Sequence, residues 1–429
     1  MKMKTKNLLL ATVLMFGSSL IFTSCSKDKN NDDDAIVLPT PTPTPDASYP
    51  SITVSGNITS NTTWSKDKIV YLDGRVIVQS PAVLTIEAGT IIKGKAGSDA
   101  NASVLIIGVG AQINATGTVS EPIIFTGEDD QIVPGQIESP NLTVNHKGLW
   151  GGLIVLGDAP VSPSTGTTAE IEGIPAGTAG TTYGGSDVSD NSGTIKYVSI
   201  RHGGVIIGSG NEINGLTLAG VGNGTTIDHV EVYANLDDGI EFFGGSVNVN
   251  DAIVVKIDDD SYDVDQSYSG TVTNFVAIVS PTAGGDAFEI DGPEGSSNSA
   301  GQFTFNKGYV VGSGSSTTIS NGNFAVFKSK AQGTFQNIHF TGFKSGALVK
   351  VLGADAYANY AGTGSSTLTI SNNTFNVSSL SGVLSSDQAF DATTFNSANS
   401  TSTGITSGVD MSQFAGWSLA SNTAQYKMQ

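Results

Sequence analysis

The sequence predicts an all-β protein built as a solenoid, in which the chain winds through successive rungs of short strands. A pattern h-x-x-h-x-h, with h an apolar residue, recurs along the chain, and its shortest spacing is roughly 22 residues. Glycine supplies 53 of the 429 residues, and no sustained apolar stripe with helical spacing follows the N-terminal segment. A short repeat with insertions is typical of a solenoid, in which each repeat forms one rung.

The first 24 residues predict a secretion signal that is not part of the fold. Three lysines precede an apolar run over residues 8–22, which is short for a membrane span. Residues 22–25 (Phe-Thr-Ser-Cys) resemble a bacterial lipobox, and Cys25 is the only cysteine. The resemblance implies cleavage before Cys25 and its lipidation, which would anchor the protein to a membrane. A disulfide between two chains is the alternative role for this residue.

Residues 25–48 predict a tether, with an acidic run at Asp32–Asp34 and a Thr-Pro repeat at Pro39–Pro45 that favours extended polyproline II structure. We expect it to hold a β-solenoid domain, residues 49–429, away from the membrane. Loss of residues 1–24 removes three lysines and changes the net charge from −19 to −19 − 3 = −22. So acidic a chain is a poor candidate for nucleic-acid binding.

The rungs themselves can be followed from Val83–Ile86 and Val104–Ile107 onward. Turns rich in Gly, Asn, Asp and Ser separate the apolar runs. A β-sandwich or a propeller is the alternative, but either requires hairpins with two-residue turns, which the spacing does not favour. Open strand edges need covering, and we expect Asp410–Trp417 to form one cap. Four later copies of the pattern carry Asn or Asp at the third position, which predicts a stacked polar ladder at a bend: Asp251, Asn274, Asn337 and Asn372.

The segment Asp237–Asp291 is the most unusual stretch of the sequence. Three short strands within it alternate apolar and acidic residues, at Ile240–Phe242, Tyr262–Asp265 and Phe288–Asp291. If these strands stack in register, their carboxylates form two columns on the outer surface. Like charges directly opposite one another destabilise a sheet. The columns therefore require a bound cation, raised pKa values or full solvation.

These carboxylates suit Ca²⁺, which takes six to eight oxygen ligands. The alternative is that aspartates in Asp-Asp-Gly turns simply favour turn geometry and stay solvated. Tyr262 offers a ring and Lys256 a cation for a bound ligand, although a core position for Tyr262 and a solvated position for Lys256 are the ordinary roles of such residues. The candidate metal ligands are Asp237, Asp238, Glu241, Asp260, Asp263, Asp265, Glu289 and Asp291.

Several motifs resemble a family of secreted β-helix lipoproteins common in Bacteroidetes. They are Val83–Gly94, Glu121–Thr126, Gly148–Pro160 and Asp237–Gly245, and the similarity covers roughly residues 60–345. The resemblance implies a right-handed, single-stranded parallel β-helix on an outer-membrane lipoprotein displayed at the cell surface. It implies no settled activity. Pectate-lyase-like polysaccharide-active proteins share the β-helix class by fold alone.

Three functional hypotheses follow. The first is a non-enzymatic, monomeric surface lipoprotein that binds a glycan or another extracellular ligand through an acidic, Ca²⁺-bound face. The second is a polysaccharide lyase or glycoside hydrolase, and the third is a structural or adhesive rod. No catalytic residue can be assigned, and the cations available to a lyase are few. They are Arg201, Lys256, Lys328 and Lys350, of which Lys350 is expected to continue the acidic face.

Overall fold

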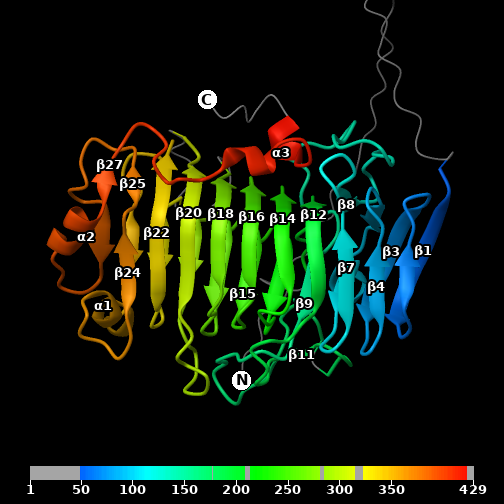
Figure 1. Cartoon of the computed structure of the whole chain (residues 1–429), viewed down its shortest axis with the longest axis horizontal. Coiled ribbons are helices and arrows are strands. Elements are labelled where there is room, and N and C mark those ends of the chain that lie inside the picture. Colours follow the sequence, from blue (N-terminus) through cyan, green and yellow to red (C-terminus); the bar gives the residue numbers. More distant parts are fainter. Residues whose placement is uncertain (1–48, 176, 208–212, 281–284, 315–321, 423–429) are drawn as a thin grey trace, which may run out of the picture. The chain divides into compact units, whose positions relative to one another are not determined.

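The computed structural model describes residues 49–175, 177–207, 213–280, 285–314 and 322–422, all within the compact unit formed by Pro43–Gln429. In this unit the strands stack side by side, and the chain passes through the stack in sequence order (Figure 1). Within the large sheet, successive rungs pair in parallel. The prediction of an all-β parallel solenoid is therefore confirmed.

Three N-terminal features predicted from the sequence lie outside the described residues: the signal segment 1–24, Cys25 and the tether 25–48. Among the residues that the structure does describe, no helix is long and apolar enough to cross a membrane.

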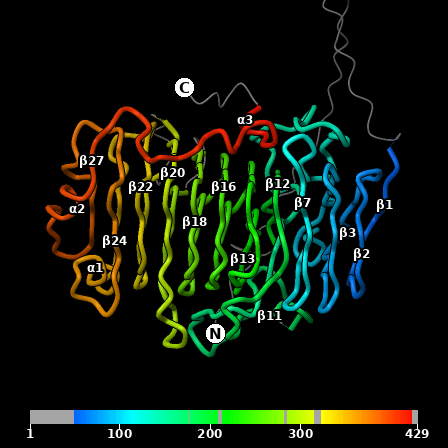
Figure 2. Tube along the Cα trace, viewed as in Figure 1, coloured from blue at the N-terminus to red at the C-terminus, as the bar shows by residue number. Residues whose placement is uncertain are grey.

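Each rung contributes strands to three faces, here called A, B and C, and Figure 2 traces the chain from one face to the next. Face A contains β2 (Thr62–Trp64), β4 (Val83–Ile86), β7 (Gln112–Thr116), β24 (Leu368–Ser371) and the first halves of six long strands, β12 (Gly193–Arg201), β14 (Thr226–Tyr233), β16 (Asn248–Val255), β18 (Thr271–Ile278), β20 (Phe303–Val311) and β22 (Gly333–Thr341).

Face B contains the second halves of those long strands, the first halves of β1 (Ser51–Ile58) and β3 (Ile69–Val78), and β5 (Ile91–Gly94), β8 (Ile123–Gly127), β25 (Thr374–Phe375) and β27 (Ser400–Thr401). Face C contains the second halves of β1 and β3 with β6 (Val104–Ile107), β9 (Leu153–Leu156), β13 (Leu216–Ala219), β15 (Ile240–Phe243), β17 (Tyr262–Asp265), β19 (Phe288–Ile290), β21 (Ala325–Phe327), β23 (Val349–Val351) and β26 (Leu384–Ser386).

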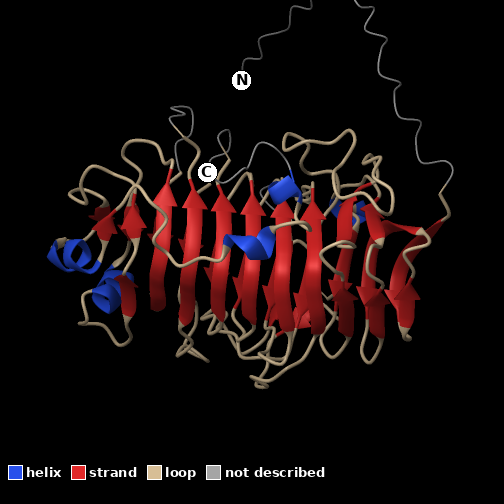
Figure 3. Ribbon diagram, turned by 45° about the horizontal axis from the view of Figure 1, so that its top comes forward, coloured by secondary structure: helices blue, strands red, loops and turns tan. Residues whose placement is uncertain are grey.

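Few other elements interrupt the strands (Figure 3). They are the antiparallel ribbon β10 (Ala169–Glu170) and β11 (Thr182–Tyr183), the helices α1 (Ala354–Tyr360), α2 (Thr393–Ala398) and α3 (Leu419–Asn422), and the 3₁₀ turns η1 (Asp99–Asn101) and η2 (Met411–Phe414).

The predicted polar ladder is present at the corner between faces A and B. Asp251, Asn274, Asn337 and Asn372 all adopt left-handed backbone angles, with φ between 55° and 57°. Asn and Asp tolerate this region better than most residues. Asn274 Nδ2 donates to Asp251 Oδ1 at 2.5 Å, which links these two rungs, whereas Lys307 occupies the corner of the rung between Asn274 and Asn337. A single left-handed residue therefore turns each long strand from face A to face B.

The interior between the faces is apolar and, toward the C-terminal half, strongly aromatic. Tyr262, Phe275, Phe288 and Phe305 are buried and lie within 5.8 Å of one another, measured between ring centroids. Most of these rings meet edge to face, which is a favoured geometry for aromatic pairs. The alternate residues of the same strands point outward, and their positions define the surface of each face.

The C-terminal segment 402–422 runs back along face B, across strands that lie far earlier in the sequence (Figure 1). Asp410 N donates to Asn274 Oδ1 at 2.5 Å, and two N–H groups at the start of α3 donate to the carboxylate of Glu231 at 3.0 and 2.8 Å. Trp417 meets Tyr197 edge-on at 5.8 Å. These residues cover the side of the rungs, so Asp410–Trp417 does not act as the expected end cap.

The last rung is covered by α2 instead. Phe395 of this helix is buried and lies 5.7 Å from Phe375 of β25, measured between ring centroids. A helix laid over the final strands shields their apolar interior from water.

Candidate functional site

Face C carries the acidic column predicted from the sequence. Glu241 of β15, Asp263 of β17 and Glu289 of β19 stand beside one another in the parallel register. The column continues with Val326 and then Lys350, so the expected position of Lys350 is confirmed. Neighbouring strands lie about 4.8 Å apart, so the carboxylates repel one another unless something compensates their charge.

A second, shorter column lies at the ends of the same strands. Asp291 N donates to Val264 O at 2.7 Å, which places Asp291 beside Asp265. Lys328 follows on the next rung, and its Nζ lies 2.6 Å from Glu289 Oε1 and 3.9 Å from Asp291 Oδ2. Partial burial opposes the charged form of Lys328, but its hydrogen bond with Glu289 and the nearby carboxylates raise the pKa of Lys328 overall. Lysine thus compensates this part of the acidic surface.

The other part of the surface is a tight group of three carboxylates. Asp238, Glu241 and Asp263 place oxygen atoms within 4.8 Å of one another, and Asp237, Asp238 and Asp259 form a second such group that shares Asp238. Asp238 is 7% exposed and Glu241 4% exposed, so full solvation is wrong for both carboxylates. Carboxylate oxygens at this spacing could hold a hard divalent cation, with carbonyls and water completing its shell.

The pKa values of the group reflect its burial. Burial, with the neighbouring carboxylates, raises the pKa of Glu241 and Asp263 well above their ordinary values. Burial also raises the pKa of Asp265 to about 7 and that of Asp291 to about 6. Bound protons or a bound cation would therefore reduce the repulsion among these carboxyl groups and stabilise the folded state.

A ladder of aspartates precedes face C on successive rungs. Asp238 Oδ1 accepts a hydrogen bond from Asp260 N at 2.9 Å, and Asp260 accepts one from Asp286 N. Asp286 Oδ1 in turn accepts from Asn323 N at 2.7 Å. Each carboxylate uses one oxygen to satisfy the backbone of the next rung. Asp260 thus serves mainly as a link in this ladder, whereas Asp238 also belongs to both three-carboxylate groups.

Loop 157–192 covers the N-terminal half of face C and forms one wall of the acidic surface. Ile171 and Ile174 of this loop are buried in one cluster with Ile106 and Ile154 of face C. At the boundary with the acidic half, Tyr183 Oη donates to Gln266 Oε1 at 3.2 Å. Glu172 of this loop lines a small cavity with Asn214 and Thr217, and its charge acts on Glu241, so the loop borders this carboxylate.

The structure corrects both predicted ligand contacts. Tyr262 is fully buried in the aromatic interior, and its hydroxyl donates to Val276 O at 3.2 Å. Lys256 lies in the turn between faces B and C, where its Nζ donates to Val279 O at 3.3 Å. Burial, with the charge of Lys147, lowers the pKa of Lys256. Neither side chain belongs to the acidic surface, because the strand alternation directs Tyr262 inward and a left-handed turn directs Lys256 elsewhere.

The sequence-based prediction missed Asn214, whose Nδ2 donates to Glu241. Its Oδ1 is buried and has no hydrogen-bond partner among the described residues, and it lines a cavity of about 10 Å³ beside Thr217. The sequence contains a pattern that could have identified Asn214. Asn214-Gly215 precedes β13 in the same way as Asp238-Gly239 precedes β15. An added Cβ at either glycine would lie within 2.4 Å of a valine side chain, so both positions exclude larger residues.

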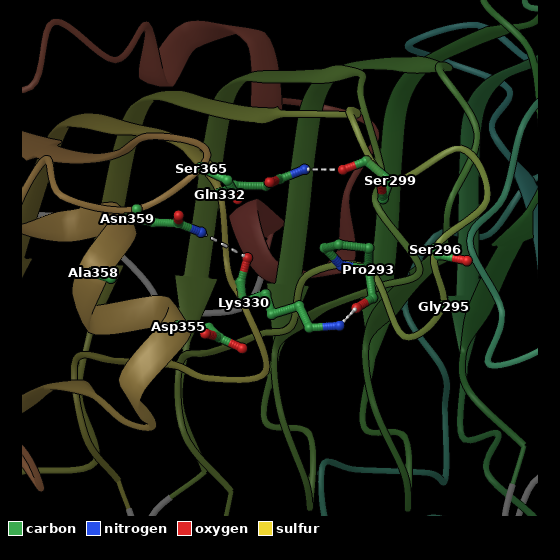
Figure 4. Close-up of a pocket in the computed structure, with 11 residues that line it drawn as sticks. Pro293, Gly295, Ser296, Ser299, Lys330, Gln332, Asp355, Ala358, Asn359 and Ser365 are labelled. Atoms are coloured by element: carbon green, nitrogen blue, oxygen red, sulfur yellow. Dashed lines mark hydrogen bonds between the residues drawn. The ribbon is translucent and has the colours of Figure 1, made fainter.

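A polar pocket of about 330 Å³ opens next to the lysine-paired carboxylates (Figure 4). The turn 293–299, which begins two residues after Asp291, forms one wall. Lys330 and Gln332 form the floor, and α1 contributes Asp355 and Asn359 to the opposite wall. The acidic surface and the pocket thus lie on consecutive turns at the edge of face C.

One comparison with known proteins identifies a family. The model of the pectate-lyase-like β-helix domain matches residues 56–418. Neither the curated proteins nor the solved structures yielded a match.

Proposed function

The chain belongs to the family of pectate-lyase-like β-helix domains, and we propose that it is a non-enzymatic, surface-anchored lipoprotein that binds an extracellular glycan at face C. In this proposal a divalent cation, Ca²⁺ foremost, occupies the group formed by Asp238, Glu241 and Asp263. The lipid on Cys25 anchors the protein to the outer membrane, and residues 25–48 hold the β-helix away from it.

The observation that carries this proposal is a group of three carboxylates with mutual oxygen distances within 4.8 Å, of which Asp238 and Glu241 are buried and Asp263 is half-buried. Burying charged groups together is costly unless protons or a cation compensate them. Lys328 forms ion pairs with Glu289 and Asp291, whereas among the described residues it forms none with Glu241 or Asp263, although the charge of Asp263 still acts on it.

Calorimetric titration of the full chain with Ca²⁺ tests the cation site. We expect binding that is lost in Glu241→Gln and in Asp263→Asn, because each removes a charged ligand. Asp73→Asn is the matched control, since Asp73 is exposed and, among the described residues, its ion pair is with Lys95 at 2.9 Å. The site is refuted if Ca²⁺ gives no heat and the melting temperature is the same in Ca²⁺ and in chelator.

The anchor has its own test. Cys25→Ser removes the only thiol in the sequence, so we expect the variant to leave the membrane fraction of the cells that make it. A variant that stays with the membrane to the same extent as the unchanged protein would contradict lipid anchoring through this residue.

A polysaccharide-degrading enzyme is the second candidate, favoured by one observation. Asp265 and Asp291 are neighbours with pKa values raised to about 7 and about 6, and hydrolases use carboxyl pairs as acid and base. Lyase chemistry is less well supported, since the raised pKa of Lys328 disfavours a neutral base and Arg201 is fully buried beside Glu231. Release of reducing ends or unsaturated products from polysaccharides would establish catalysis, and loss of either in Asp265→Asn would assign it.

A further inference from the structure

The pocket beside α1 has walls that are held in place by two buried amide side chains. Gln332 is 5% exposed, and its Nε2 donates to Ser299 O and Gly301 O, both at 2.7 Å. Asn359 is 4% exposed, and its Nδ2 donates to Lys330 O at 3.2 Å (Figure 4). These bonds tie together three consecutive turns of the β-helix. The pocket is therefore preformed, as most small-molecule sites are.

Lys330 enters this pocket from a backbone conformation that favours glycine. Ser329 and Lys330 have φ values of 43° and 67°. Aligned through the strand register, the corresponding positions are Gly244 and Gly245 after β15, with φ values of 62° and 77°, and Gln266 and Ser267 after β17, with φ values of 53° and 67°. A left-handed conformation is unfavourable for residues with a Cβ and is often found at functional sites. A lysine at this position lowers the stability of the folded protein. Ligand binding by its side chain would offset that loss in the bound state.

The charges of the pocket are balanced, unlike those of the neighbouring surface. Lys330 Nζ donates to Pro293 O at 3.4 Å and has no ion pair among the described residues. Asp355 supplies one carboxylate on the opposite wall, and the other polar groups are hydroxyls and amides. None of the lining residues is aromatic. Such a lining offers hydrogen bonds in both directions and no net charge, which matches a neutral, hydroxyl-rich ligand.

We infer that this pocket is a binding subsite for a neutral sugar ring of the glycan, an inference that rests on the proposed glycan-binding function. Its volume of about 330 Å³ lies at the small end of the range for ligand sites, which suits one or two rings. Lys330 would donate to ring hydroxyls and Asp355 would accept from them. The rest of the glycan would extend past Pro293 toward Asp291 and Lys328.

The left-handed backbone provides a clean test of this subsite. Lys330→Gly removes the side chain and relieves the backbone, so the melting temperature should not fall. Lys307→Gly is the matched control, because Lys307 is an exposed lysine with φ of 62° in β20, at the corner between faces A and B. Asp355→Asn tests the opposite wall without a change in side-chain size.

The measurement is calorimetric titration of the full chain and its variants with neutral gluco-, manno-, xylo- and galacto-oligosaccharides and with an oligouronate, in Ca²⁺ and in EDTA. We expect at least one neutral oligosaccharide to bind in both buffers. Lys330→Gly and Asp355→Asn should weaken that binding about tenfold or more, as loss of a charged hydrogen-bond partner does. Lys307→Gly should leave it unchanged.

The subsite is refuted if no neutral oligosaccharide binds, if only the oligouronate binds, or if both pocket variants bind as tightly as the unchanged protein. Measurements in Ca²⁺ and in EDTA distinguish failure of the subsite from failure of the proposed cation site. Neutral-sugar binding in EDTA with no Ca²⁺ binding would remove the cation site alone, whereas Ca²⁺ binding lost in Glu241→Gln without any sugar binding would remove the subsite alone.

Discussion

The two halves of face C use the same outward position in opposite ways. In the N-terminal half this position holds Ile77, Ile106 and Ile154, which are buried beneath loop 157–192. In the C-terminal half it holds Glu241, Asp263 and Glu289. The register runs without a break from one half to the other through a buried threonine, Thr217.

This difference shows that stacking multiplies the effect of the residue type at one position, because the same position recurs on every rung. A parallel β-helix places equivalent residues about 4.8 Å apart on successive rungs. A stack of isoleucines stabilises the fold once a loop covers it. A stack of carboxylates repels itself and requires compensation, which the chain supplies at Glu289 through Lys328. The group around Glu241 is where we propose that a cation supplies it.

A carboxylate in the apolar half should have the largest effect on stability. Ile154→Asp would bury a charge beneath loop 157–192, where apolar side chains surround it. We expect a loss of about 4 kcal/mol or more in the free energy of unfolding, measured by urea denaturation. Ile154→Val, which only removes a methylene, should cost about 1 kcal/mol. A midpoint for Ile154→Asp close to that of Ile154→Val would contradict the contrast between the halves.

Neutralising a carboxylate in the acidic half should raise the free energy of unfolding, whereas adding one to the apolar half lowers it. In chelator at pH 8, Glu241→Gln should stabilise the protein by roughly 1–2 kcal/mol, because it removes a buried carboxyl group that must either stay charged or take up a proton on folding. Glu231→Gln is the matched comparison on face B. That carboxylate accepts hydrogen bonds from Ser199 and two N–H groups of α3 and lies 3.8 Å from Arg201. Its neutralisation should destabilise by about 1–3 kcal/mol, and equal signs for the two variants would be inconsistent with this account.

The pH dependence of stability should sharpen the comparison. Folding raises the pKa of Asp265 to about 7 and that of Asp291 to about 6, from an unfolded value near 3.9. The folded state therefore binds more protons than the unfolded state, and stability falls as pH rises from about 4 to about 7. Melting scans in chelator should show this decline, and Ca²⁺ should reduce it. A melting temperature that instead rises over this interval would exclude raised pKa values at these sites.

The smallest effect concerns the contact that joins the two halves. Tyr183→Phe removes the hydroxyl that donates to Gln266 at 3.2 Å and leaves the ring against Phe243. We expect a loss of about 1 kcal/mol and faster hydrogen exchange within loop 157–192 than in the strands. Unchanged exchange in that loop would show that its apolar contacts alone hold it on face C.

Much of the fold could be predicted from local patterns. The alternation of Tyr262-Asp263-Val264-Asp265 assigns alternate sides to neighbouring residues in any extended strand. The third-position Asn and Asp residues identify the corner, because they tolerate its backbone angles better than most residues, although Tyr197, His229 and Lys307 adopt the same angles in other rungs. The same alternation also places Tyr262 inside, and its assignment as a ligand contact failed because the ring was weighed without the strand that carries it.

The sequence by itself determined the parallel rungs, the polar corner and the acidic column, since each depends on residues that are close together or that repeat. Only the tertiary structure decided which carboxylates are buried, because the surroundings of Glu241 include Asn214 from the preceding rung and the charge of Glu172 from loop 157–192. It also decided that Lys328 pairs with Glu289 and that Asn214 reaches Glu241. These contacts join side chains from different rungs, and burial and pKa depend on everything that surrounds a group in space.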